Sequence, residues 1–582
     1  LYHKRLAIID PEGGHQPMTC GPLTLVCNGE LYNYCELKAE LSGRGHEFHT
    51  HSDTEVILKL YAEYGDRAFA RMNGMFALLL HDRERHRLIA ARDHFGVKPL
   101  YLHNASGRWL FASEIKALLA HPDVNATPDL DSIHDYLTFQ FVLGEATMFR
   151  GIRKVAPGSF LVIDERTGRP REVQYWTPCF AVRERSSERE VVAEVRTLID
   201  DAVAQQARSD VPIGSYLSGG LDSSIVTTLA ARHRPDLRAF TGVFEDGPQF
   251  NESAYARSVA QSSGVELCEV RPTEEEFIAA LPRLIYHMDE PSAGPGLFPQ
   301  YAVAHRASQH VKVMLGGQGG DEIFGGYARY LVAYLEQALK GAIYDTNDEG
   351  EHIVSLTSIT SNLPYLRDYV PLLQHFWRDD LFEPMDRRYF RLIDRSGGVR
   401  ELLSEDVVAG FDAAAVFARF QQVFNHPDTT SYFNKMTHFD MVTSLPALLQ
   451  VEDRVSMACS IESRVPLLDP RIADLVSTLP PRMKFKGGEL KYLLRRAAGD
   501  VLPASVFARK DKMGFPVPLQ KWLRGQTAEF VRDTFSSQAA RSRGWYNGAA
   551  IERALSDEPA FGRRIWGLLC LELWFQRFID AP

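Results

Sequence analysis

Short apolar segments separated by turn-forming residues occupy the beginning of the chain. The segments lie at Leu23–Cys27, Met75–Leu80, Leu88–Ala91 and Ser159–Ile163. Their length and the turns between them predict β-strands. The apolar residues of Thr54–Tyr64 instead repeat at helical spacing, which predicts one amphipathic helix. Residues 1–177 are therefore expected to form an α+β sandwich.

The pattern changes after residue 190, where apolar strands are each followed by a helix. The predicted strands are Val211–Leu217, Ala239–Phe244 and Val311–Leu315, and each ends at a cluster of Gly, Ser or Asp. Such alternation is typical of an α/β fold with a parallel sheet, which binds ligands at the carboxyl ends of its strands. Residues 335–440 are expected to be mostly helical additions. The polar, non-periodic segment 178–190 is expected to link residues 1–177 to a second domain, residues 191–582.

Composition narrows the class of protein. At 582 residues the chain is too long for one core, and its 45% hydrophobic content excludes disorder. A net charge of -10 without a long Lys/Arg run argues against a nucleic-acid partner. No apolar stretch reaches the roughly 18–20 residues of a membrane span, so we expect a cytoplasmic protein. The seven cysteines are scattered without a C-x-x-C pair, which disfavours a disulfide framework or a zinc site.

A strand, a glycine loop and a helix start follow one another between Val211 and Ala231. The loop, SGGLDSS at Ser218–Ser224, combines glycines that let the backbone approach an anion with hydroxyls and unpaired helix N–H groups. It can hold phosphate, although no lysine follows the glycines as in the common nucleotide loop. Asp222 would repel phosphate unless a cation lies between them, so we expect Mg²⁺.

A second glycine cluster, Gly316–Glu322, follows another predicted strand. Because the carboxyl ends of parallel strands share one sheet edge, Asp222 and Asp321 are expected on either side of a metal-bound pyrophosphate. The alternative for each cluster is a glycine turn without a ligand.

Five motifs together resemble the synthetase domain of the asparagine synthetases. They are SGGLDSS, TGVFED (Thr241–Asp246), LGGQGGDEIFGGY (Leu315–Tyr327), EDRVSMACSIESRVPLLD (Glu452–Asp469) and KMGFPVP (Lys512–Pro518). The resemblance implies an ATP pyrophosphatase fold, transfer of AMP to a carboxylic acid with release of pyrophosphate, and attack of ammonia on the acyl adenylate. Aspartate is the default acid, and its pocket is expected in Asp289–Pro299 and Arg464–Asp469.

The resemblance also implies roles for individual residues. The adenine pocket would include Leu217, Val243 and Gly317, and the pyrophosphate loop would include Ser218, Gly219, Gly220, Asp222 and Ser223. Asp222 and Asp321 would hold Mg²⁺, with Asp321 also counted as catalytic. Lys491 would neutralise charge on the transferring phosphoryl group. The alternative for Lys491 is a solvated surface charge.

Gln318 departs from the family, many members of which carry Glu at this position. Glutamine cannot act as a general base, although its amide can hold an adenylate by hydrogen bonds. The identity of the acid is therefore left open.

The amino-terminal third contains the ingredients of an amino-acid pocket: Arg5, Asn28, Gly29, Glu30 and Asp53. Taken singly, Arg5 could be a surface charge, Asn28–Gly29 a hairpin turn and Asp53 a helix cap. The order HKRLAIID, NGELYN, HSDTE, MNGMFALLL and RDHFGVKPLY is similar to the glutaminase domain of class II glutamine amidotransferases. That similarity implies an N-terminal-nucleophile-type sandwich whose glutamine-binding residues are those five.

The nucleophile of that family is a cysteine at the mature N-terminus, whose own amine acts as base. Since Leu1 and Tyr2 match the stretch just before the arginine motif, we expect the cysteine and the first strand upstream of Leu1. Cys27 lies inside a predicted strand and is expected to be a packed thiol.

The leading hypothesis is an ATP-dependent amide synthetase that acts on small molecules: a carboxylic acid, ATP, and glutamine or ammonia. One alternative is a cysteine-less relative, similar to the β-lactam synthetases, that forms an amide or a ring from an amine. The retained glutamine-binding residues and the absence of those enzymes' tyrosine at Gln318 disfavour it. A scaffold with a decayed site is disfavoured by the intact SGGLDSS and GGDE clusters. A homodimer is one arrangement left open.

Overall fold

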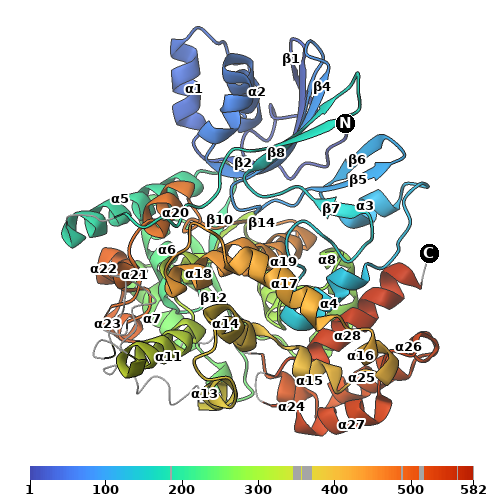
Figure 1. Ribbon diagram of the computed structural model, residues 1–582. Coiled ribbons are helices and arrows are strands. Elements are labelled where there is room, and N and C mark those ends of the chain that lie inside the picture. The colour runs from blue at the N-terminus through green and yellow to red at the C-terminus, as the bar shows by residue number, and fades with distance from the viewer. Residues whose placement is uncertain are drawn as a thin grey trace.

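The amino-terminal part of the chain is built on a six-stranded antiparallel sheet with the order β1-β2-β3-β4-β8-β9. The strands are β1 (Met18–Cys20), β2 (Leu23–Leu31), β3 (Gly74–Asp82), β4 (Arg87–Arg92), β8 (Ser159–Asp164) and β9 (Pro170–Gln174). The helices α1 (Tyr34–Gly43) and α2 (Asp53–Tyr64) pack on one face of the sheet (Figure 1). The four strands and the helix predicted here are confirmed.

A smaller sheet covers the opposite face of the first. Its order is β6-β5-β7, with β5 (Tyr101–Ala105), β6 (Arg108–Ala112) and β7 (Ile152–Lys154). Successive side chains of a strand point to opposite faces of the sheet. Ala90 and Leu161 therefore lie between the two sheets, while their neighbours Ile89 and Phe160 face the helices. The expected α+β sandwich is therefore confirmed.

The computed structural model describes residues 1–183, 187–344, 356, 370–486, 489–509, 517–559 and 562–580. The motif predicted at Lys512–Pro518 thus lies largely outside the described residues, as do part of the expected linker 178–190 and part of the helical region 335–440.

A five-stranded parallel sheet with the order β12-β11-β10-β13-β14 forms the centre of the larger part. The strands are β10 (Ile213–Tyr216), β11 (Arg238–Gly242), β12 (Glu266–Val270), β13 (Val313–Leu315) and β14 (Glu462–Arg464). The expected parallel sheet is confirmed, and the three predicted strands form β10, β11 and β13. The edge strands β12 and β14 were not predicted, because their charged residues give no apolar run.

Helices cover both faces of this sheet. Val313 and Leu315 of β13 face α5 (Glu188–Gln206) and α6 (Leu221–His233), whereas Met314 faces α9 (Leu297–Ala307). Helix α5 begins at Glu188, inside the expected linker 178–190, because the Ser187 side chain accepts a hydrogen bond from the Glu190 amide.

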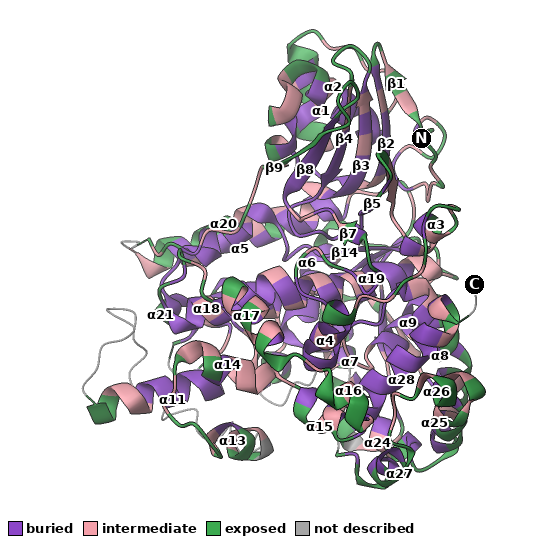
Figure 2. Ribbon diagram, turned by 45° about the vertical axis from the view of Figure 1, so that its right-hand side comes forward, coloured by how far each residue is buried: buried purple, intermediate pink, exposed green. Residues whose placement is uncertain are grey.

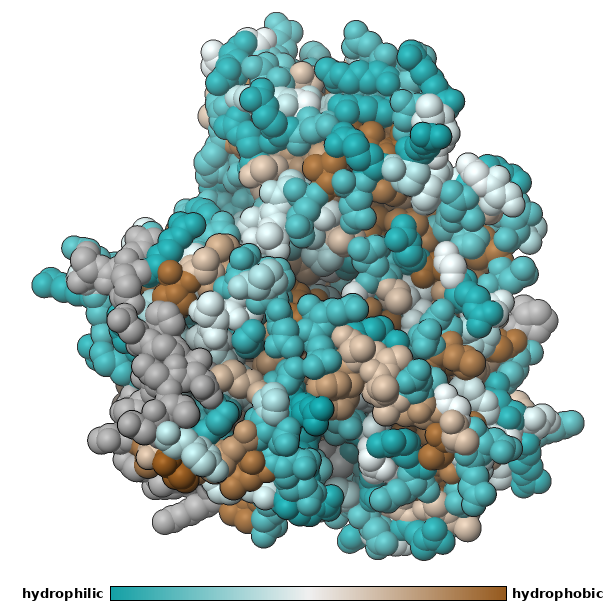
Figure 3. All heavy atoms as spheres, viewed as in Figure 1, coloured by the Kyte–Doolittle hydropathy of each residue, from teal (hydrophilic) through white to brown (hydrophobic). Residues whose placement is uncertain are grey.

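Further helices pack around this α/β core (Figure 1). They include α11 (Ala328–Tyr344), α14 (Met385–Ile393), α15 (Ser396–Arg400), α18 (Tyr432–Phe439), α19 (Leu445–Ala458), α22 (Tyr492–Ala498) and α28 (Arg564–Trp574). Helices α19 and α28 are largely buried in the interior (Figure 2). The face in Figure 3 is mostly hydrophilic, with apolar residues in small groups. Among the described residues, no helix has the length and apolarity needed to cross a membrane.

Candidate functional site

The loop after β10 has the geometry of an anion-binding turn. The Ser218 and Ser223 hydroxyls lie 3.1 Å apart, and the Gly220 amide donates to Ser218 Oγ over 3.3 Å. Gly219 has a φ of 73°, and a Cβ there would lie 2.5 Å from Tyr255 Cβ. Only glycine fits both constraints, so Gly219 allows the tight turn that leads into the N-terminus of α6.

The glycine loop after β13 packs directly on the first loop. A Cβ at Gly317 would lie 2.6 Å from the Ser223 amide nitrogen, and one at Gly320 would lie 2.6 Å from Asp222 Oδ1. The two loops, which are far apart in sequence, thus meet at the carboxyl ends of β10 and β13.

Lys491 lies between the two acidic residues of these loops. Its Nζ is 2.5 Å from Asp222 Oδ2 and 2.7 Å from Asp321 Oδ1. Lys491 is buried at the start of α22 and adopts a left-handed backbone with a φ of 56°, which is costly for a non-glycine residue. A Cβ at Gly326 would lie 2.0 Å from both Asp321 Oδ1 and Lys491 Cε. The lysine is therefore a packed part of this centre and not a solvated surface charge.

The donor set suits a magnesium–phosphate complex better than an all-protein metal cage. In the part of the chain that the structure describes, no three His, Cys, Asp or Glu side chains group to hold a metal. Two carboxylates, Asp222 and Asp321, meet through Lys491 beside the glycine turns. Mg²⁺ commonly takes one or two protein carboxylates and completes its shell with phosphate oxygens and water. These residues therefore fit a metal-bound triphosphate.

The residues expected at the adenine lie next to this centre. Leu217 and Val243 are buried at the carboxyl ends of the adjacent strands β10 and β11, and the Leu217 amide donates to the Phe240 carbonyl. Gly317 packs against the phosphate loop, as described above. The structure thus brings the expected nucleotide residues to one sheet edge.

Glu452, on α19, is a buried carboxylate that the sequence analysis did not single out as a functional residue. Its Oε2 accepts a hydrogen bond from Gln318 Nε2 over 3.3 Å, and Gln300 and Ser463 also donate to this carboxylate. Burial raises its pKa, although all three partners are donors, as an ionised carboxylate requires. Glu452 opens one of the five motifs that carry the family resemblance, but no local pattern in the sequence shows that it lies beside Gln318.

Strand β14 separates this centre from the candidate glutamine residues. Ser463 points toward Glu452, whereas Arg464 points the other way and its Nη2 lies 3.8 Å from Glu30 Oε2. Successive residues of a strand face opposite sides, so one short strand lines both places. Glu462 shares the Arg464 side and lies 2.8 Å from its Nε.

Four of the five candidate glutamine residues lie close together around β2. Burial raises the pKa of both Glu30 and Asp53. The charge of Asp53 raises the pKa of Glu30 further, and both carboxylates raise the pKa of the nearby Cys27. Asp53 accepts from the Leu31 and Thr54 amides at 2.8 Å. Gly29 has a φ of 139°, and a Cβ there would meet the Met75 carbonyl. Cys27 is buried, and burial raises its pKa, as expected of a packed thiol.

Arg5 is engaged by its own loop. Its guanidinium donates to the carbonyls of Ile9 at 2.6 Å and Asp10 at 2.9 Å. Asp10 in turn accepts from the His51 amide, two residues before Asp53. Within the described residues, Asp10 therefore links Arg5 to the segment that carries Asp53.

Buried polar contacts join the two parts of the chain at this junction. Asn28 Nδ2 donates to Ser113 Oγ over 3.2 Å, and Arg454 of α19 donates to the Ser113 carbonyl over 2.5 Å. Lys98 pairs with Asp453 at 2.8 Å, and both side chains are buried. The adjacent residues Asp453 and Arg454 thus hold the amino-terminal part next to Glu452.

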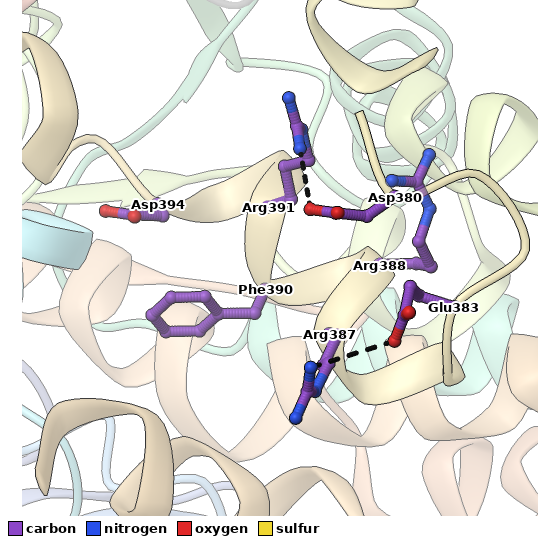
Figure 4. Close-up of a pocket in the computed structure, with 7 residues that line it drawn as sticks. All are labelled: Asp380, Glu383, Arg387, Arg388, Phe390, Arg391 and Asp394. Carbon is purple, nitrogen blue, oxygen red and sulfur yellow. Dashed lines mark hydrogen bonds and ion pairs between the residues drawn. The ribbon is translucent and has the colours of Figure 1, made fainter. Parts of the chain in front are cut away.

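A separate cavity of about 270 Å³ lies beside α14, away from these loops (Figure 4). Its arginines have carboxylate partners: Arg391 pairs with Asp380, Arg387 with Glu383 and Arg388 with Glu336. The remaining lining residues are Phe390 and Asp394. With its charges matched internally, this cavity offers no obvious binding chemistry.

Comparisons with known proteins found two family models, which match different parts of the chain. A family model described as asparagine synthase matches residues 194–576, and one described as glutamine amidotransferase domain matches residues 1–176. Asparagine synthetase [glutamine-hydrolyzing] 1 of Bacillus subtilis is 35% identical over 98% of this chain and 88% of its own length. A putative asparagine synthetase of Mycobacterium tuberculosis is 34% identical over 99% and 88%.

More distant relatives carry other names. Amidase chry2 of Gibberella zeae is 26% identical over 97% of this chain and 87% of its own length. Among solved structures, glutamine phosphoribosylpyrophosphate amidotransferase from B. subtilis matches 43% of this chain and 61% of its own, with 15% identity and a TM-score of 0.20. That structural likeness is too weak to build on.

Proposed function

The chain belongs to the asparagine synthase family, with an amino-terminal glutamine amidotransferase domain, and from that premise we propose that it converts a carboxylic acid to its amide with ATP. Nitrogen would come from glutamine, or from ammonia supplied directly. AMP and pyrophosphate would be the products of ATP. The full-length similarity to both asparagine synthetases and an amidase leaves aspartate as one candidate acid among several.

The observation that carries the proposal is the contact of Lys491 with both Asp222 and Asp321. It gathers a phosphate loop, two potential metal ligands and a cation where the reacting phosphorus would lie. A carboxylate attacking the α-phosphate brings two negative groups together, so positive charge fixed at that point lowers the barrier. Bound Mg²⁺, held by Asp222 and Asp321, would neutralise the leaving pyrophosphate.

The protein's own residues would act in the first step as follows. Ser218, Ser223 and the backbone at Gly219 and Gly220 would hold the pyrophosphate oxygens. The carboxylate oxygen of the acid would attack the α-phosphorus, forming the acyl–phosphate bond as the bond to pyrophosphate breaks. Lys491 would stay beside the phosphorus and balance the charge of the transition state.

In the second step ammonia would attack the acyl carbon and displace AMP, and the proton that the nitrogen loses would pass to the departing phosphate or to water. Gln318 cannot take up that proton, but its amide can orient the incoming nitrogen. Because a carboxylate only accepts hydrogen bonds, Glu452 fixes the Gln318 NH₂ group toward itself and leaves the amide oxygen available for an N–H donor. We assign Glu452 the role of a positioning residue for this step.

The five residues around β2 and its preceding loop, Arg5, Asn28, Gly29, Glu30 and Asp53, are proposed to bind glutamine. The short distance from Arg464 to Glu30 supports a transfer of ammonia past β14, because Ser463 on the same strand contacts Glu452. Two domains linked in this way could release ammonia near the place where it is used.

The test is an acid panel with ammonium chloride as nitrogen donor. Pyrophosphate and AMP should form only when a suitable acid is present, with one amide formed for each pyrophosphate. Aspartate is included beside other amino acids and uronic acids. Release of ADP and phosphate instead of AMP and pyrophosphate, or no acid-dependent turnover with any member, would contradict the proposal.

A further inference from the structure

Asp289, the first residue of the expected acid loop Asp289–Pro299, is fully buried against the amino-terminal part of the chain. Its Oδ2 accepts hydrogen bonds from the Ile115 amide over 2.8 Å and from Arg454 Nη2 over 3.1 Å. Its Oδ1 accepts from the Lys116 amide over 3.2 Å and lies 2.7 Å from Lys116 Nζ. A carboxylate has about four acceptor positions, so these four donors leave none for a substrate.

Glu290, the next residue, is held by a second amino-terminal segment. Its Oε2 accepts a hydrogen bond from the Met148 amide over 2.9 Å, and its Oε1 lies 3.2 Å from Lys154 Nζ. Helix α3 (Ile115–Leu119) thus supplies partners of Asp289, and β7 supplies Lys154. Both carboxylates of the loop are therefore engaged by the amino-terminal part.

The loop needs such support because two of its residues adopt a left-handed backbone. Asp289 has a φ of 63° and Ala293 a φ of 58°, which is unfavourable for residues other than glycine. Helix α28 fixes their carbonyls: Trp574 Nε1 donates to that of Asp289 over 3.0 Å, and Trp566 Nε1 to that of Ala293 over 3.2 Å. The Ala293 amide donates to the Gln140 carbonyl over 2.8 Å. A strained backbone persists only where its surroundings hold it from several sides.

The loop leads directly to the residues proposed for amide formation. It continues into α9, where Gln300 donates to Glu452, and Glu452 also accepts from Gln318 over 3.3 Å. Arg454, two residues after Glu452, holds the beginning of the loop at Asp289. A displacement of the loop would therefore move the start of α9 relative to Glu452.

We propose that Asp289 is a positioning residue, through which the amino-terminal part holds the acid loop in its binding conformation. This inference rests on the proposed function, because it concerns acid binding at the same site. Asp289 itself would not touch the acid, since its two oxygens already accept from four donors. The amino-terminal part would then do more than supply nitrogen: its contacts would set the affinity for the acid even when ammonia is the donor.

Hydrogen–deuterium exchange of the loop tests this role without any acid. Lys116→Met removes one charged donor from Asp289, whereas Lys116→Arg retains a cation at the same place. In the full chain, the backbone amides between Ala293 and Phe298 should exchange at least about 10-fold faster in Lys116→Met than in the wild type, and within about 2-fold in Lys116→Arg. Unchanged exchange of these amides in Lys116→Met would overturn the assignment.

Lys98→Met is the matched control, because it also breaks a buried ion pair between the two parts, but with Asp453 and not with a loop residue. It should lower the melting temperature and leave the exchange of the loop within about 2-fold of wild type, since the loop amides exchange through local opening. Equal loosening of the loop in Lys98→Met and Lys116→Met would contradict a specific role of Asp289. Lys154→Met, which breaks the contact at Glu290, carries the same test where Lys116→Met does not fold.

Turnover gives a second readout, which a loss of folded protein would not produce. With ammonium chloride and the acid that releases pyrophosphate fastest in the panel, Lys116→Met should raise the KM for the acid about 10-fold, while kcat and the KM for ATP stay within about 2-fold. Fewer molecules in the binding conformation weaken the apparent affinity for the acid in proportion. Fewer folded molecules lower kcat alone, so a lower kcat at an unchanged KM for the acid would refute the positioning role.

Failure of the proposed ligase activity would give a different result. A wild-type protein without acid-dependent pyrophosphate release, whose loop is loosened by Lys116→Met and not by Lys98→Met, would keep Asp289 as the residue that holds the loop and contradict only the reaction. Acid-dependent pyrophosphate release, with the loop unchanged in Lys116→Met, would support the reaction and contradict the role of Asp289.

Discussion

The Nζ atom of Lys491 lies 2.5 Å from Oδ2 of Asp222, a residue 269 positions earlier in the chain. The same ammonium reaches Asp321 at 2.7 Å. Lys491 therefore occupies the space between the two carboxylates that we propose hold Mg²⁺. A cation bound there must share or displace this contact, since both compete for the same carboxylate oxygens.

Replacement of Lys491 by Met should separate the effect of Lys491 on Mg²⁺ binding from its effect on pyrophosphate release. Removal of the ammonium leaves Asp222 and Asp321 without their shared cation, so Mg²⁺ should bind to the nucleotide complex more tightly than in the wild type. Pyrophosphate release should nevertheless fall at least about 100-fold, the usual cost of losing one preorganised charge at a transition state. A Mg²⁺ titration of ATP-analogue binding, paired with a pyrophosphate assay, measures both. Weaker metal binding would contradict the competition.

The hydrogen bond between Gln318 and Glu452 predicts that a variant of Glu452 loses amide formation but keeps adenylation. Glu452→Gln removes the acceptor-only partner, so the Gln318 amide is free to turn over. Adenylation, followed as acid-dependent exchange of labelled pyrophosphate into ATP, should stay within about 3-fold of wild type, while amide formation from ammonia falls about 10²-fold or more. An equal loss in both assays would instead indicate a structural role.

A double variant in which Gln318 and Glu452 exchange their side chains provides the matched control for that prediction. Gln318→Glu combined with Glu452→Gln restores one carboxylate and one amide in hydrogen-bond contact, with the carboxylate at the position where many family members have it. This double variant should recover amide formation relative to Glu452→Gln alone. A double variant no better than the single one would refute the coupling of the two side chains.

The phosphate centre could be predicted from sequence because each part is a local pattern. Gly219 and Gly320 signal tight turns after apolar strands, and parallel strands bring such turns to one edge. Lys491 was assigned only through the family resemblance, since a single lysine has no periodic signal. Its left-handed backbone and its burial are tertiary features that no local pattern encodes.

Strand β14 shows where sequence reasoning fails. Its residues Glu462, Ser463 and Arg464 are all polar, yet all are buried, because the amino-terminal part covers this sheet edge. The information that buries them is in long-range contacts between segments.

The buried pair of Lys98 and Asp453 should stabilise the junction of the two parts. Removing one partner of such a pair leaves a buried charge, which costs about 3–5 kcal/mol. Lys98→Met should therefore lower the melting temperature markedly, and Lys98→Met with Asp453→Leu should recover much of the loss. Arg108→Ala, which breaks an exposed pair with Asp123, is the control and should cost less than about 1 kcal/mol. Additive losses in the double variant would exclude the pairing as the cause.

Lys484 predicts how stability changes with pH. Its side chain is fully buried, with its Nζ 3.0 Å from Asn434 Oδ1 and 5.3 Å from the centre of the Phe180 ring. His438 stacks edge-on against Phe180, and burial lowers its pKa to about 3, so it adds no charge at neutral pH. Desolvation lowers the pKa of Lys484 from 10.5 to about 7, and no carboxylate among the described residues contributes to the shift.

Because this pKa is lower in the folded protein, the unfolded chain binds the extra proton between about pH 7 and 10.5. The contribution of Lys484 to stability should then rise with pH through this window, by up to about 1.4 kcal/mol per pH unit. Below about pH 7 both states are protonated, so the penalty is fully present and changes little. The melting temperature of Lys484→Met should therefore exceed that of the wild type most at pH values near and below neutral, and the difference should shrink as the pH rises. Lys486→Met, which removes an exposed lysine paired with Glu188, is the control and should show no such trend over the same range. A difference between wild type and Lys484→Met that is constant from neutral to alkaline pH would show that Lys484 is protonated in the folded protein.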